Sequence, residues 1–186
     1  MTLVLGCAFT FATHAQQVGI KSNVLADAFL SPNLGMEVSL SQKFSLDVTG
    51  QVNFWTVDNR KWKHWLVQPE GRYWFCQALS GHFVGLHALA GEFNLGNINL
   101  PIDFVGAGTH RYRDERYQGW MAGAGVAYGY SWMLHKHWNL EAEIGVGWIY
   151  NHYDKYECVT CGHRTGKGHH NYFGPTKAAI NIVYIF

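Results

Sequence analysis

The residues best suited to chemistry lie in one polar stretch near the C-terminus. It contains a C-x-x-C pair, Cys158 and Cys161, followed by His163, His169 and His170. Cysteine and histidine are preferred zinc ligands, but the spacing from the pair to the histidines is short for a separately folded zinc module. Outside the cell, the two cysteines would instead form a disulfide. A disulfide, a metal site and free reactive thiols therefore remain open.

A second candidate is the pair of carboxylates Glu141 and Glu143, which alternation places on one face of their segment. Paired carboxylates can act as acid and base when a cleft holds the substrate between them. The same face of other segments carries bases, and a narrow ring of strands has no such cleft. We therefore expect a network of paired charges in the interior, formed by Lys21, Glu37, Asp47, Glu70, Arg72, Glu141, Glu143 and Lys177.

Nucleophilic catalysis by serine finds no support in the motifs. The chain has no Gly-x-Ser-x-Gly elbow, the motif that exposes a serine nucleophile on a sharp turn. Histidines such as His64, His82 and His137 fall near expected strand ends, where contact with lipid headgroups is the simpler interpretation. We expect no catalytic residue and no cofactor, and a lipid-modifying enzyme is the least favoured alternative.

The composition narrows the class of protein that must position these residues. Of 186 residues, 48% are hydrophobic, 16% aromatic and 15% charged, and glycine is the commonest at 21. The charged fraction is far below the roughly 25% of average soluble domains, and so many aromatic residues exclude a disordered chain. A net charge of +1 argues against a nucleic-acid partner, because neutralising phosphates needs a basic surplus.

Alternation of large apolar residues with small or polar ones predicts about eight strands. The clearest is 117–134, whose uncharged part resembles a membrane helix by hydropathy alone. From 120 to 132 its even positions are all apolar or aromatic, and from 119 to 131 glycine holds four of the seven odd positions, a period of two that indicates a strand. The other expected strands are 18–26, 33–40, 44–55, 65–75, 82–94, 138–150 and 178–186.

The connections between these strands are of two kinds. Short connections are expected at 41–43, 76–81 and 135–136, and long ones at 56–63, 95–116 and 151–171. The first hairpin, 27–32, is an exception, because it is short where the alternation predicts a long connection. Successive connections of an up-and-down meander lie at opposite ends. Outer-membrane barrels have this asymmetry, with short periplasmic turns and longer extracellular loops.

The direction of the two faces separates a soluble barrel from a membrane barrel. One face bears the eight charges named above, and the other is large, apolar and often ends in Trp, Tyr or Phe. Eight strands enclose room only for packed side chains, whereas aromatic girdles suit a membrane boundary. We therefore expect an all-β, eight-stranded antiparallel up-and-down transmembrane β-barrel, with a soluble barrel as the alternative.

Both ends of the chain bear on its location. Residues 1–15 form a short apolar run ending in small residues, which predicts a signal peptide although no Lys or Arg precedes the run. A lipidated Cys7 and a buried first strand are the alternatives. The barrel domain is then 16–186. Its last strand ends in Tyr184 and Phe186, which resembles the C-terminal signal read by the outer-membrane assembly machinery, unless the terminal Phe is coincidental.

Several stretches are similar to a known family. The longest are KWKHWLVQPE (61–70), WNLEAEIG (138–145) and NYFGPTKAA (171–179). Together with shorter ones they resemble a Bacteroidota family of outer-membrane β-barrel proteins catalogued as domain of unknown function 3575. The resemblance covers nearly the whole expected domain and implies an outer-membrane location. It implies no activity, substrate or catalytic residue.

The function expected from the sequence is that of a non-catalytic surface protein that presents long loops to a partner. The loops hold most of the basic residues, nearly balanced by acids, and 95–108 is apolar for a surface loop, which suits contact with another protein. A narrow pore is the alternative. The expected partners are membrane lipid, lipopolysaccharide, the assembly machinery and a surface protein, with no nucleic acid.

Overall fold

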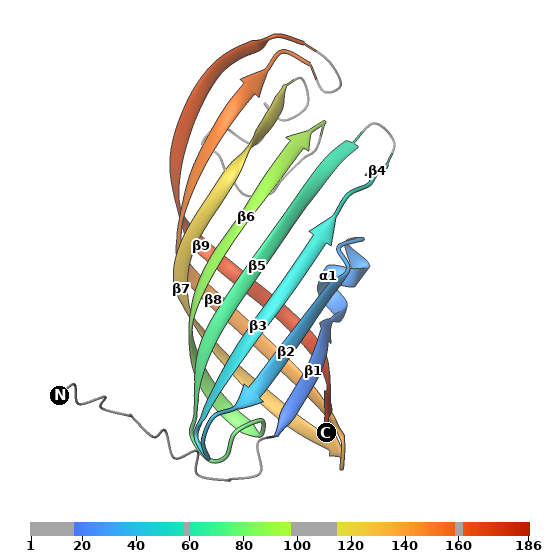
Figure 1. Cartoon of the computed structure of the whole chain (residues 1–186), viewed down its shortest axis with the longest axis vertical. Helices are drawn as coiled ribbons and strands as arrows, with labels where there is room; N and C mark the ends of the chain where they lie inside the picture. Colours follow the sequence, from blue (N-terminus) through green and yellow to red (C-terminus); the bar gives the residue numbers. More distant parts are fainter. Residues whose placement is uncertain (1–16, 58–59, 98–114, 159–161) are drawn as a thin grey trace, which may run out of the picture.

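The chain folds almost entirely into antiparallel strands (Figure 1). The computed structural model describes residues 17–57, 60–97, 115–158 and 162–186, so the expected signal peptide lies outside the described residues. No helix in these ranges is long and apolar enough to cross a membrane. The elements are β1 (Val18–Asn23), α1 (Val24–Ala28), β2 (Asn33–Ser39), β3 (Phe44–Asn53), β4 (Thr56–Val57), β5 (Arg60–Trp74), β6 (Gly81–Gly96), β7 (Arg116–His135), β8 (Trp138–Tyr156) and β9 (Arg164–Ile185).

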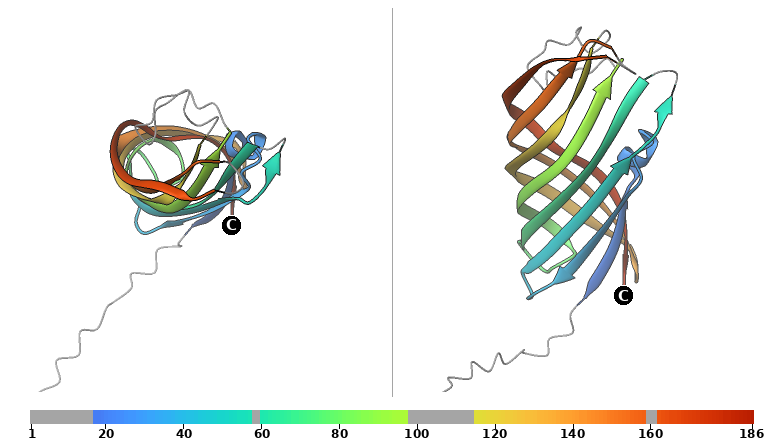
Figure 2. Two further views of the ribbon diagram at one scale, coloured as in Figure 1. Left: turned by 90° about the horizontal axis from the view of Figure 1, so that it is seen from above. Right: turned by 45° about the horizontal axis from the view of Figure 1, so that its top comes forward.

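Eight of the strands pair in a closed ring. The order is β3-β2-β1-β9-β8-β7-β6-β5, and pairing of β3 with β5 closes it, while the two-residue β4 pairs only with the start of β5. Seen from above, the strands surround a central interior (Figure 2). The prediction of an all-β sheet of eight antiparallel strands is confirmed.

Several predicted strand boundaries are wrong, and β5 begins at Arg60, earlier than expected. β8 continues to Tyr156 and β9 begins at Arg164, so most of the expected long loop 151–171 is strand. Polar residues occupy both faces there, which hides the alternation. The first strand, expected to reach Ala26, ends at Asn23, because the Asn23 side chain accepts a hydrogen bond from Leu25 N and caps the short helix α1.

The wall of the ring is low on the β1 side. β9 pairs with β1 only from Ile185 back to Asn181. The Asn23 side chain holds the next positions of β9, donating to Ala178 O at 3.2 Å and accepting from Ile180 N at 3.1 Å. Beyond Ala178, β9 pairs only with β8 within the described part of the chain. β8 and β9 therefore rise well above β1 and α1 (Figure 1).

Candidate functional site

Eight charged side chains meet in the interior of the ring. They come from β1, β2, β3, β5, β8 and β9, and the most exposed of them, Lys177, has a side chain only 7% accessible. Alternate residues of a strand point to opposite faces, so inward-facing positions of six strands converge here. The structure thus brings together every member of the expected set: Lys21, Glu37, Asp47, Glu70, Arg72, Glu141, Glu143 and Lys177.

Arg72 is the centre of this network. One terminal nitrogen of its guanidinium lies 2.7 Å from Glu37 Oε2 and 2.9 Å from Glu141 Oε2. The other lies 2.8 Å from Glu143 Oε2, and Nε lies 2.7 Å from Glu70 Oε1. The planar fork of donors in an arginine suits such simultaneous contacts. One cation therefore links strands on opposite sides of the ring.

Two lysines add further positive charge to the network. Lys21 Nζ lies 2.8 Å from Glu37 Oε2 and 3.1 Å from Asp47 Oδ1. Lys177 Nζ lies 2.7 Å from Glu70 Oε2. Five carboxylates share three cations, and each cation contacts more than one acid. This geometry stabilises the interior and links its strands.

Glu141 and Glu143 are engaged in this network and do not face a cleft. They are 1% and 5% exposed, and both accept hydrogen bonds from Arg72. A catalytic carboxylate pair needs room for a substrate between its members. The arrangement therefore favours ion pairing over acid–base catalysis.

The lower interior is closed by the connection between β5 and β6, which folds inward. Leu79 is 3% exposed and has a φ of +67°, a value that non-glycine residues rarely adopt. Its carbonyl accepts hydrogen bonds from Asn139 Nδ2 at 2.6 Å and Ser131 Oγ at 3.2 Å. The rings of Trp74 and Phe83, 4.6 Å apart and fully buried, pack between this turn and the charges.

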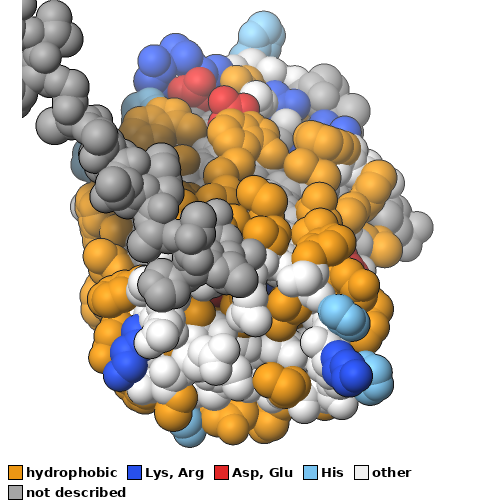
Figure 3. All heavy atoms as spheres, turned by 60° about the horizontal axis from the view of Figure 1, so that its bottom comes forward, with side chains coloured by type: hydrophobic (Ala, Val, Ile, Leu, Met, Phe, Trp, Pro, Cys, Tyr) orange, Lys and Arg blue, Asp and Glu red, His pale blue; other side chains and the backbone are white. Residues whose placement is uncertain are grey.

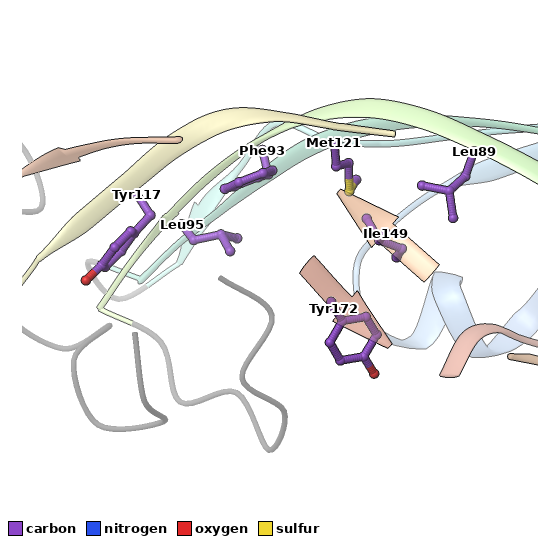
Figure 4. Close-up of a cluster of buried hydrophobic side chains, with 7 residues drawn as sticks. All are labelled: Leu89, Phe93, Leu95, Tyr117, Met121, Ile149 and Tyr172. Atoms are coloured by element: carbon purple, nitrogen blue, oxygen red, sulfur yellow. The ribbon is translucent and has the colours of Figure 1, made fainter. Parts of the chain in front are cut away.

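Above the charges the interior becomes apolar. A cluster of seven buried side chains lines this level (Figure 4), with Leu66 and Tyr153 packed against it. The cluster is not evident in the sequence, because its members come from four strands and only the register shows that they meet. They are Leu89, Phe93, Leu95, Tyr117, Met121, Ile149 and Tyr172.

Aromatic side chains gather at two levels of the outward face. At the lower level Phe44, Tyr73 and Phe75 form a chain with ring centroids 5.2 and 6.1 Å apart. At the upper level Trp120 and Tyr150 lie 5.6 Å apart. Between the two levels the exposed residues are mainly aliphatic, including Val48, Val67, Leu86, Val126, Ile144 and Val146.

The end of β9 belongs to the lower aromatic level. Tyr184 lies with its ring centroid 5.0 Å from those of both Trp138 and Phe186. The Phe186 backbone N–H donates to Val18 O at 3.0 Å. The two residues of the expected assembly signal are thus held beside the first strand.

At the upper level the outward face becomes polar. The register places a row of polar side chains next to a row that contains two indoles, and together they line an open trough of about 340 Å³. Trp65 Nε1 donates to Glu92 Oε2 at 3.2 Å within it. The rows are Lys63, Asn94, Gln118 and Asp154, and Trp65, Glu92, Trp120 and His152.

Comparison with known proteins places the chain in a family. The model of the family described as Protein of unknown function (DUF3575) matches residues 1–186. The chain belongs to this family. The resemblance to DUF3575 is thus confirmed, and the description of the family names no activity. Neither the curated proteins nor the solved structures give a match.

The C-x-x-C stretch of the DUF3575 protein lies partly outside the described residues, because Cys161 is not among them. His169 and His170 are consecutive in β9 and point to opposite faces, so they cannot converge on one ion. His169 stacks on Tyr150 at 6.1 Å, and His163 is exposed. In the ranges that the structure describes, no group of three or more His, Cys, Asp or Glu residues is arranged to hold a metal ion.

A substitution at Gly85 tests how tightly the charges are packed. A Cβ at this position would lie 2.5 Å from Glu70 Oε1. We expect Gly85→Ala to lower the free energy of unfolding by ~1–3 kcal/mol, because it displaces Glu70 from Arg72. The measurement is urea unfolding of the refolded protein in detergent micelles.

The matched control is Gly71→Ala on the neighbouring strand. A Cβ there meets no atom within 4 Å, so the expected change is within ~0.5 kcal/mol. Equal losses at Gly85 and Gly71 would contradict the packing argument.

Proposed function

We propose that this DUF3575 protein is a non-conducting transmembrane β-barrel of the bacterial outer membrane that presents its polar end to the cell surface. The observation that carries the proposal is the direction of the two faces. Charged side chains are buried, while large hydrophobic ones are exposed on all eight strands of the ring, and Figure 3 shows those on one face. Soluble proteins rarely bury this many charges, even as ion pairs, and rarely expose contiguous apolar surface on this scale.

The dimensions support insertion in a bilayer. Between Trp120 and Tyr130 of β7, a rise of ~3.3 Å per residue and a tilt of ~40° give a band ~25 Å tall. This is the height of the apolar band of outer-membrane barrels. A ring of paired strands also satisfies its backbone hydrogen bonds without water, as the hydrocarbon region requires.

Two barriers in the interior argue against a pore. The network around Arg72 crosses the ring, and the inward turn at Leu79 closes the lower end. Eight strands enclose too little space for an open aqueous channel. An ion would have to separate several buried ion pairs and pass the rings of Trp74 and Phe83.

The polar end supports contact with lipopolysaccharide. The trough lies beside the upper aromatic level, where headgroups would meet the wall. Its indoles suit the faces of sugars, and Lys63 and His152 suit phosphate groups. Strands β3, β6 and β8 end on this side of the ring (Figure 1), and we propose that the residues following them contact a surface protein.

Electrophoresis with and without boiling tests the proposal. The full chain is expressed in a Gram-negative host, and the membranes are fractionated before the gel is run. We expect the protein in the outer-membrane fraction, with faster mobility before boiling because the closed sheet resists the detergent. Soluble periplasmic protein with no shift in mobility would overturn the proposal.

Conductance tests the closed interior. The same protein, reconstituted in a planar lipid bilayer, is expected to produce no steady channel. A reproducible single-channel current would instead support the narrow pore. The control is the same preparation from a host that does not express the protein. A current that is also present in this control comes from a contaminant.

A further inference from the structure

A cavity of about 240 Å³ lies inside the ring, at the level of the apolar cluster. Its floor adjoins the charges, since Thr176 Oγ1 lies 2.9 Å from His87 Nε2, and His87 Nδ1 lies 3.6 Å from Glu70 Oε2. Its walls are mostly aliphatic or aromatic. They include Leu66, Leu89, Phe93, Leu95, Met121 and Ile149.

The size and lining of the cavity suit hydrocarbon. A dry cavity of ~150 Å³ lined by Leu, Ile and Phe is already large enough to bind benzene. The present cavity is larger and has the same kind of lining. A flexible alkyl chain fits it better than a charged or sugar ligand, which would lose its hydration against apolar walls.

One corner of the cavity is polar. Gln51 Nε2 and His64 Nε2 lie 3.0 Å apart, and both residues line the cavity. The other ring nitrogen of His64, Nδ1, is buried and has no hydrogen-bond partner within the described residues. A ligand with a single polar group at one end of an apolar chain would satisfy this nitrogen.

The cavity also reaches the low part of the wall. Pro175 and Thr176 of β9 line it, and they lie just beyond Ala178, where the Asn23 side chain makes the last contact between β1 and β9. Within the described residues, β9 has no strand beside it there except β8. An acyl chain would enter from a surrounding lipid layer along this edge, beside the short helix α1.

We propose that the cavity binds a fatty acyl chain, with the carboxyl or ester group of the chain at His64. Two sources share this chemistry, a free fatty acid and the chain of a membrane lipid. Binding requires only the folded ring. It therefore goes beyond the proposed surface function and can fail or succeed independently of it.

Titration with a fluorescent fatty acid tests the binding. The full-length protein is transferred from detergent to amphipathic polymer, because detergent tails would compete, and dansyl-labelled undecanoate is added. Leu89→Trp fills the cavity and is expected to weaken binding ~ten-fold or more. The matched control is Leu86→Trp on the outward face of the same strand, where Leu86 is 68% exposed. This variant is expected to leave the affinity within ~two-fold of the parent value.

A second variant keeps the test decisive if Leu89→Trp does not fold. His64→Ala is expected to weaken the binding of laurate, which is measured by displacement of the fluorescent probe. Displacement by dodecane, which has no carboxyl group, is expected to stay unchanged. Binding that is equal in the parent protein, Leu89→Trp and His64→Ala, or absent from the parent protein, would overturn the proposal. The mobility shift on boiling reports folding in each case.

Mass spectrometry of the purified protein distinguishes the two sources. Protein isolated from outer membranes is extracted with organic solvent, with Leu89→Trp as the matched control. Esterified lipid enriched only with the parent protein indicates a lipid chain, and free fatty acid indicates the other source. Failure of binding with an intact mobility shift would remove the acyl site and leave the proposed membrane location standing.

Discussion

Replacing Arg72 with methionine is expected to lower the free energy of unfolding by ~3–5 kcal/mol. The guanidinium is fully buried and lies within 2.9 Å of four carboxylates. Without it, five buried acids would face only Lys21 and Lys177. Removal of one partner from a buried ion pair is costly because the remaining charge is left uncompensated. Urea unfolding in micelles, followed by tryptophan fluorescence, measures the loss.

The matched control is Arg164→Met at the upper end of the ring. Arg164 pairs with Asp154 at 3.6 Å, and half of its side chain is exposed. Exposed pairs contribute ~0–1 kcal/mol, so a small change is expected. Arg72→Lys should fall between the two, because one ammonium cannot reach all the acids that the guanidinium fork contacts. A loss at Arg72 no larger than that at Arg164 would show that the network does not hold the ring together.

The ring of strands was predictable because alternation is a local signal. The period of a segment such as 117–134 can be read from its own residues. The charge network then follows, since inward positions of a closed ring must face one another. α1 was missed because Val18–Ala26 alternates through Asn23, whose side chain ends the strand. The extensions of β8 and β9 were missed because residues above the aromatic level are polar on both faces.

The upper cavity was not predictable in the same way. Leu89, Met121 and Ile149 are ordinary inward residues of three different strands. Whether they meet, and whether they leave space between them, depends on the register and on where β1 stops. Neither is encoded in a single segment. The buried Nδ1 of His64 is equally invisible in the sequence, since its lack of a hydrogen-bond partner among the described residues depends on which side chains the fold places around the ring.

A charge on the outward face distinguishes a bilayer from water as the surroundings of the ring. Val126 is 57% exposed between the two aromatic levels, and its register neighbours are Leu86 and Val146. In a membrane, Val126→Arg is expected to lower the free energy of unfolding by ~2–4 kcal/mol, the cost of arginine near the bilayer midplane. In water the same exposed substitution would change it by ~0.5 kcal/mol or less. The measurement is denaturant unfolding from lipid vesicles.

Gln118→Arg is the matched control, on the same strand and the same face but in the polar row beside the trough. Arginine near the interface costs only ~0–1 kcal/mol, so the difference between the two variants reports depth rather than charge. Folding in detergent micelles should reduce that difference, because a micelle adapts to an arginine more readily than a bilayer does. Equal stabilities of the two variants in vesicles would mean that the aliphatic band does not face hydrocarbon, and the charged interior would then need an explanation outside a membrane.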